Sequence, residues 1–129
     1  MEDFVTYELA VKLKEKGFNE PCYGYYHRGG GDDNFEVCGN GDCDFLNSKN
    51  KHRIASPTIS QVLKWLRVEK KIHLIVEISD SGWYYTLYPN VRWENGELKS
   101  DKYIMSFKHK ASYEHAALAG FEYVLDILL

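Results

Sequence analysis

The stretch that decides the fold is IHLIVEISDSGWYYTLY, residues 72–88. Apolar side chains alternate with other residues over 72–78, which is typical of a strand with one buried face. Residues 80–82, Asp-Ser-Gly, favour a turn, and the aromatic and β-branched residues of 83–88 indicate a second strand. We therefore predict an antiparallel hairpin whose second strand carries aromatic side chains on both faces.

Shorter strands are expected on both sides of this hairpin. Asn95-Gly96 is the strongest short hairpin signal, and it lies within the polar segment 92–99, which forms either a second hairpin or only a projecting loop. The remaining strands are expected at residues 22–27, 35–38, near 44–46 and at 103–107.

Three helices are expected from apolar residues at helical spacing. The first covers residues 6–16, with Thr6 as its N-terminal cap. Gly17 can take the left-handed conformation that ends a helix, and Phe18 can then fold back onto the last turn.

The second helix begins at Ser56-Pro57, or one turn later at Thr58 with Gln61 completing a capping box. The third begins after Ser112, which serves as its cap. Gly120 interrupts the third helix, and we expect that it lets another part of the chain come close.

The order of these elements shows no regular alternation of strand and helix. It therefore predicts an α+β fold, with a largely antiparallel sheet of about five strands and three helices. The sequence shows no internal repeat, low-complexity tract or long linker, so a single α+β domain over residues 1–129 is expected.

The charge balance limits the kinds of partner. The chain has 16 basic and 19 acidic residues, a net charge of -3, and so lacks the broad positive field that binding to double-stranded nucleic acid requires. The N-terminus shows no secretory signal, and the apolar stretches are too short to cross a bilayer. With three cysteines at no disulfide-like spacing, we expect a cytoplasmic protein without a membrane partner.

Neither a metal site nor a catalytic site is predicted. Cys22, Cys38 and Cys43, with His27 and His52, could supply zinc ligands, but their spacing matches no tight zinc motif. The sequence also lacks a nucleophile elbow, a metalloprotease helix and a phosphate-binding lysine motif. We therefore expect a protein that is not an enzyme and needs no cofactor.

Aromatic residues are the strongest functional signal, because they make up 15% of the chain and gather on the expected strands and loops. Rings that a sheet leaves exposed beside arginines can stack on a base or hold a partner. The alternative is a core rich in tyrosines whose hydroxyls reach water. The candidate ligand-binding residues are Tyr25, Tyr26, His27, Arg28, Arg53, Trp83, Tyr84, Arg92 and Trp93.

The Arg28-Gly29-Gly30-Gly31 segment has two interpretations. Glycine N–H groups and an arginine can contact an anion, which would suit a nucleotide. The absence of the P-loop lysine and the acidic residues Asp32 and Asp33 favour a flexible hairpin tip instead.

Four segments carry a resemblance to a known family. They are FVTYELA at 4–10, GFNEPC at 17–22, ASPTISQVLKWLR at 55–67 and SYEHAALAG at 112–120. Together they resemble a family of small uncharacterised proteins carried by gut bacteria, their phages and mobile elements. The resemblance brings no catalytic residue, and it implies an accessory role in phage or mobile-element biology.

These observations lead to one functional hypothesis and one alternative. We expect a binding protein, able to form homo-oligomers, that captures a small nucleotide-like ligand through its aromatic and arginine surface. Its most specific form is a counter-defence protein that sequesters a nucleotide-derived immune signal. The alternative is a protein–protein adaptor or inhibitor that engages a host or phage protein through the same surface.

Overall fold

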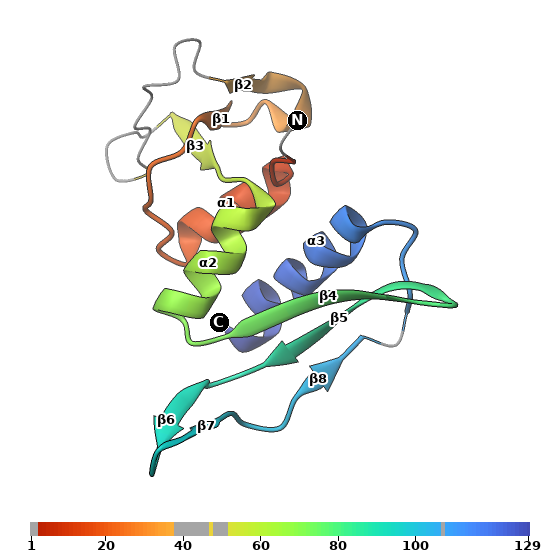
Figure 1. Cartoon of the computed structure of the whole chain (residues 1–129). Helices are drawn as coiled ribbons and strands as arrows, with labels where there is room; N and C mark the ends of the chain where they lie inside the picture. Colours follow the sequence, from red (N-terminus) through yellow and green to blue (C-terminus); the bar gives the residue numbers. More distant parts are fainter. Residues whose placement is uncertain (1–2, 38–46, 48–51, 107) are drawn as a thin grey trace. The chain divides into compact units, whose positions relative to one another are not determined.

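The computed structural model describes residues 3–37, 47, 52–106 and 108–129. In this part of the chain, three α-helices accompany eight short strands that pair antiparallel (Figure 1). The predicted α+β class with three helices is therefore confirmed. The strands form sheets of three, three and two strands, whereas the sequence suggested one sheet of about five.

The chain divides into two compact units. Unit 1 comprises Met1–Ser60 with Leu125–Leu129, and unit 2 comprises Gln61–Val124. That both belong to a single domain stays a prediction. None of the helices in the described residues is both long enough and apolar enough to span a bilayer.

In unit 1, helix α1 (Tyr7–Glu15) has the ends that its sequence predicts. The Thr6 hydroxyl accepts a hydrogen bond from the first turn, which confirms it as the cap. Gly17 has a φ of 90°, and the Phe18 N–H donates back to the carbonyl of Leu13 at 2.9 Å. Phe18 is buried, so the end of the helix also anchors the core.

The sheet of unit 1 has the order β2-β1-β3. Strands β1 (Gly24–His27) and β2 (Phe35–Val37) were predicted, whereas β3 (Arg53–Ser56) was not. Ser56 ends β3, and its hydroxyl donates to the Val5 carbonyl at 3.1 Å, so it does not cap a helix. The strand predicted near 44–46 lies outside the described residues.

Helix α2 (Ile59–Glu69) follows directly and begins where the Thr58 alternative placed it. Its apolar stripe is buried at Val62 and Leu66, and Trp65 is buried beside them. Lys64 is exposed, as expected for the solvated face.

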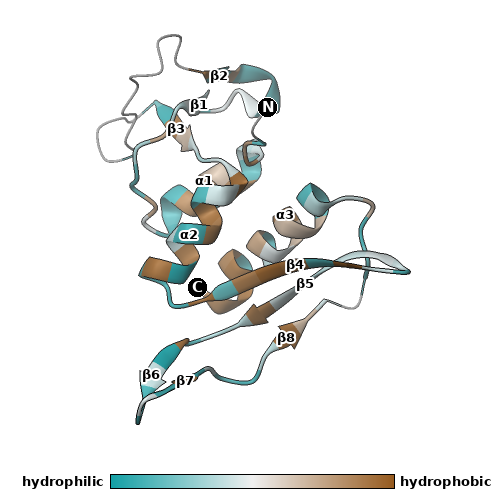
Figure 2. Ribbon diagram, in the orientation of Figure 1, coloured by the Kyte–Doolittle hydropathy of each residue, from teal (hydrophilic) through white to brown (hydrophobic). Residues whose placement is uncertain are grey.

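The predicted hairpin forms the centre of unit 2. Strand β4 (His73–Ser79) pairs with β5 (Gly82–Tyr88) across a two-residue turn, and β8 (Ile104–Met105) pairs with the other side of β5. The strand expected at 103–107 is thus shorter than predicted, and residue 107 lies outside the described part of the chain. Figure 2 shows β4 as mostly hydrophobic along its length.

Helix α3 (Tyr113–Tyr123) covers one face of this sheet and continues as a π-helical turn, Val124–Leu128. The Ser112 hydroxyl accepts a hydrogen bond from the N–H of His115, so the predicted cap is confirmed. A Cβ on Gly120 would lie only 2.5 Å from Cδ1 of Leu74 and 3.3 Å from Cγ of Tyr85. Gly120 therefore allows the close approach that the sequence predicted.

Strands β6 (Arg92–Glu94) and β7 (Glu97–Lys99) form a separate two-stranded hairpin that projects from one end of the β4–β5–β8 sheet (Figure 1). Asn95 and Gly96 both have positive φ, at 53° and 79°, which suits a tight hairpin turn. The Asn-Gly signal thus marks a true hairpin.

We predict that Gly120→Val destabilises the protein by about 2 kcal/mol, because the new side chain would overpack against Leu74 and Tyr85. Helix propensity slightly favours valine over glycine, so a loss can come only from packing. Ala119→Val in the same helix is the control and should cost only about 0.6 kcal/mol. Thermal and urea unfolding measure both, and equal losses would contradict the close approach.

Candidate functional site

The nine predicted binding residues fall into two groups. Five lie in unit 1 and four in unit 2. The unit 1 group is Tyr25, Tyr26, His27, Arg28 and Arg53, and the unit 2 group is Trp83, Tyr84, Arg92 and Trp93.

The unit 1 group contains a cross-strand cluster. The Tyr25 hydroxyl donates to Oε2 of Glu36 at 2.5 Å, and Nε2 of His27 lies 3.4 Å from Oε1 of the same carboxylate. The Arg53 guanidinium lies over the Tyr25 ring at 4.9 Å. Strand pairing explains this arrangement, because Tyr25 faces Glu36 and His27 faces Arg53. Glu36, which was not among the predicted residues, thus competes for the groups that would bind an anionic ligand.

Tyr26 points to the other side of its strand. Its side chain is only 5% exposed, its hydroxyl donates to the Val5 carbonyl at 2.7 Å, and burial raises the pKa of this hydroxyl. A ligand at the surface would not reach this ring, so Tyr26 is not a ligand-binding residue of this surface.

The glycine-rich loop after β1 folds against the start of α1. The N–H of Gly29 donates to the Tyr7 hydroxyl at 2.8 Å, and the N–H of Gly30 donates to the His27 carbonyl at 3.1 Å. The Asp32 carboxylate in turn accepts from the Tyr7 N–H at 2.8 Å. Two of the three glycine amides are therefore used within the protein, which favours the hairpin-tip interpretation over an anion cradle.

The four predicted residues of unit 2 do not form one surface. Trp83 meets Tyr113 of α3 edge-on, with ring centroids 5.9 Å apart, whereas its neighbour Tyr84 meets His109 at 5.4 Å. Successive residues of a strand point to opposite faces, so Trp83 and Tyr84 cannot form one surface. Trp93 is 76% exposed on the β6–β7 hairpin.

Arg92 is held in place by two acidic side chains. Its guanidinium lies 3.1 Å from Glu94 and 3.3 Å from Asp101. An incoming anion would have to displace these carboxylates, so Arg92 is a weaker candidate than the sequence suggested.

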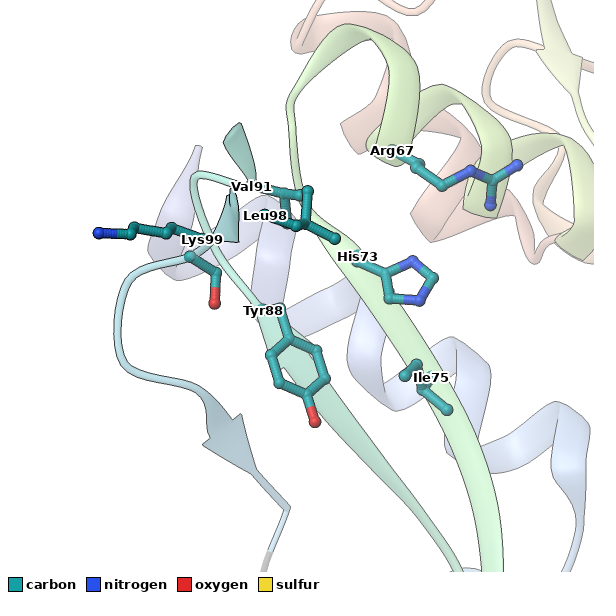
Figure 3. Close-up of a pocket in the computed structure, with 8 residues that line it drawn as sticks. Arg67, His73, Ile75, Tyr88, Val91, Leu98 and Lys99 are labelled. Atoms are coloured by element: carbon teal, nitrogen blue, oxygen red, sulfur yellow. The ribbon is translucent and has the colours of Figure 1, made fainter. Parts of the chain in front are cut away.

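A pocket of about 500 Å³ lies beside these residues in unit 2, and it contains none of the nine (Figure 3). It is formed by the end of α2, by neighbouring positions of β4 and β5, and by the base of the β6–β7 hairpin. The lining residues are Arg67, His73, Ile75, Tyr88, Val91, Leu98, Lys99 and Ser100.

The register of the β4–β5 hairpin places the pocket on the sheet face away from α3. Leu74 and Tyr85 pack at Gly120 of α3, so the residues that alternate with them point to the opposite face. His73 and Tyr88 are directly paired there, with ring centroids 6.3 Å apart. Their rings form an aromatic wall, next to an aliphatic one.

The aromatic wall continues toward β8. The rings of Tyr88 and Tyr103 lie 6.0 Å apart, and Tyr103 is 54% exposed. Tyr103 and Trp93 are therefore aromatic rings that the protein leaves exposed.

The positive charge at the pocket comes from Arg67 and Lys99. Among the residues that the structure describes, neither takes part in an ion pair, in contrast to Arg92. Figure 3 shows the Lys99 ammonium extending away from the other labelled side chains, so its stem lines the pocket. Arg67, at the end of α2, is the other cation that lines the pocket.

One sequence signal could have found this pocket. His73 and Ile75 of β4 and Tyr88 of β5 share a face of the sheet, the one opposite the apolar stripe that predicted the hairpin. The contributions of Arg67 and Leu98 depend on how α2 and the β6–β7 hairpin fold beside the sheet, which no local pattern shows.

Within the described residues, no three His, Cys, Asp or Glu side chains are grouped so that they could hold a metal ion. Cys38 and Cys43 lie outside those residues, so zinc binding is not tested by this observation. Comparisons with protein-family models, curated proteins and solved structures found no match for the chain. What the pocket holds must therefore be inferred from its own chemistry.

The unit 1 cluster gives a pH prediction. The hydrogen bond from Tyr25, with His27 adding to it, lowers the pKa of the Glu36 carboxyl below its ordinary value. Glu36 therefore contributes stability above its unfolded-state pKa, and this contribution is lost as the pH falls through the lower folded-state pKa. Tyr25→Phe removes the main donor, so the pKa of Glu36 should rise toward its ordinary value.

NMR titration of the side-chain carboxyl carbons measures this pKa directly. Tyr23→Phe, at an exposed tyrosine nearby in sequence, is the control and should leave the titration of Glu36 unchanged. A pKa of Glu36 that is the same in Tyr25→Phe and the wild type would show that this hydrogen bond does not form in solution.

Proposed function

We propose that the chain is a non-enzymatic binding protein that holds a small, planar, negatively charged ligand of the nucleotide type in the unit 2 pocket. One observation carries the proposal. The pocket combines the His73–Tyr88 ring pair with Arg67, a cation that has no ion-pair partner among the described residues.

Each part of the pocket suits one part of such a ligand. Stacking of a base on an aromatic side chain contributes about 1–3 kcal/mol, and it depends little on which base is bound. A guanidinium matches the geometry of a phosphate and can donate two hydrogen bonds to it. Ile75, Val91 and Leu98 supply the apolar walls that exclude water from the ring.

The size of the pocket is consistent with this class of ligand. Small-molecule sites have volumes of about 300–1,000 Å³, and this pocket has about 500 Å³. The pocket is therefore large enough for a nucleotide.

The most specific form of the proposal concerns biology. We propose that the ligand is a nucleotide-derived immune signal, and that the protein acts in the cytoplasm as a counter-defence protein of phage or mobile-element type. Support for this form comes from the sequence resemblance of four segments and from the chemistry of the pocket.

Isothermal titration calorimetry against mononucleotides, cyclic nucleotides and ADP-ribose tests the proposal. We expect binding of at least one compound, weakened about tenfold by Tyr88→Leu through loss of stacking. Arg67→Gln should weaken it by a similar factor through loss of a charge-assisted hydrogen bond. The absence of heat across the panel would contradict nucleotide binding.

Two control variants test whether the ligand binds in the pocket or at residues outside it. Arg92→Gln changes an arginine that is already ion-paired, and Tyr23→Leu changes an exposed tyrosine in unit 1. Both should bind as the wild type does. A loss of binding in either control equal to that in Arg67→Gln would place the site elsewhere.

The β6–β7 hairpin favours the alternative, an adaptor or inhibitor of another protein. Trp93 and Leu98 face each other across its two strands and are 76% and 62% exposed. Exposed aromatic side chains of this kind are frequent anchors at protein interfaces. A pull-down from host lysate should capture a stoichiometric partner with the wild type. Trp93→Ser should abolish binding of this partner, whereas Tyr23→Ser should retain it. A pull-down without such a partner would contradict the adaptor.

A further inference from the structure

Strand β4 lies at the edge of its sheet. The strand order is β4-β5-β8, and within the described part of the chain β4 pairs only with β5. At seven residues, β4 is much longer than the opposite edge strand, β8, which has two. A long unpaired edge is a template for another strand.

The backbone of β5 shows which groups of β4 are available. Trp83 exchanges two backbone hydrogen bonds with Lys110, and the Tyr85 carbonyl accepts from the Ser106 N–H at 3.0 Å. These groups of β5 therefore point away from β4. In an antiparallel ladder the direction alternates along each strand, so the residues of β4 that face Trp83 and Tyr85 direct their own N–H and C=O groups outward.

The register identifies these residues as Ile78 and Val76, with Leu74 next in the same series. Their outward N–H and C=O groups form a row along the free edge. The backbone N–H and C=O groups of the alternate residues, by contrast, point toward β5. These residues are His73, Ile75 and Glu77. The edge thus offers three evenly spaced residues to a new strand.

The side chains of the edge lack the usual protection against pairing. Natural edge strands carry lysine, proline or a bulge to prevent it. Strand β4 has no lysine or proline, its pairing with β5 is continuous, and its single acidic residue is Glu77. Ile78 is 64% exposed beside the open groups.

We propose that β4 pairs antiparallel with β4 of a second copy of this chain, with the twofold axis at Val76. This register places Leu74 opposite Ile78 of the second copy and Val76 opposite its own equivalent. All three outward residues are aliphatic, so each pair joins two apolar side chains and covers the exposed Ile78. On the sheet face toward α3, the outward residues of β4 are therefore complementary to themselves, which identifies a second copy as the occupant.

The dimer is expected to be weak and reversible. A stable interface buries about 1,200–2,000 Å², more than two seven-residue strands provide by themselves. Pairing would join two three-stranded sheets into one of six, with a pocket of each copy on the same sheet face, since His73 and Ile75 belong to β4. The inference does not depend on what the pocket binds.

Sedimentation velocity over a wide range of concentration tests the proposal on the full chain. The wild type should shift from monomer toward dimer as the concentration rises. Ile78→Lys introduces a charge at the interface and should remain monomeric, and so should Ile78→Pro, which removes an outward N–H but no bond to β5. Ile127→Lys, at a comparably exposed isoleucine of unit 1, should dimerise as the wild type does.

Amide hydrogen exchange followed by NMR provides a second readout. The amides of Leu74, Val76 and Ile78 should become protected as the concentration rises, while those of Ile75 and Glu77 are protected throughout. A chain that is monomeric at every concentration would overturn the proposal. A dimer that survives Ile78→Lys and Ile78→Pro, or one that Ile127→Lys also abolishes, would overturn it equally.

Discussion

The register of the β4–β5 hairpin is the constraint on which the candidate site depends. It is set by the two-residue turn between Ser79 and Gly82. Gly82 has a φ of 122°, and a Cβ there would lie 2.8 Å from the Lys110 carbonyl oxygen, so only glycine fits. A slip of one residue would exchange the two faces of the strand. His73 of β4 and Tyr88 of β5 would then lie on opposite faces of the sheet, and the aromatic wall of the pocket would be lost.

Most elements of the fold could be predicted because their signals are local. The caps Thr6 and Ser112, Gly17 and the Asn-Gly turn depend on the conformations of a few adjacent residues, and the structure has each of them. Strand β3 was missed because three of its four residues are buried, which removes the alternation that marks a strand. Ser56-Pro57 also imitates the start of a helix. The division into three small sheets depends on long-range pairing, which the sequence pattern does not report.

The site was harder to predict than the fold. Composition showed a surplus of aromatic rings, and exposed rings are present at Tyr23, Trp93 and Tyr103. It could not show that Tyr26 is buried or that nearby carboxylates hold Arg92. The pocket was missed because its residues come from α2, two strands and a hairpin, and their proximity arises only when these elements pack. The one local indication of the pocket was that His73 and Tyr88 alternate with the apolar residues of their strands and so lie on the opposite face.

Cross-strand contacts between α-protons, observed by NMR, test the hairpin register most directly. In an antiparallel pair, residues that are directly opposite but not hydrogen-bonded bring their Cα atoms to about 4.5 Å. The structure predicts such contacts for Leu74 with Leu87, Val76 with Tyr85 and Ile78 with Trp83. Contacts offset by one residue, such as Leu74 with Thr86 or Tyr88, would exchange the faces of the strand and contradict the account of the pocket.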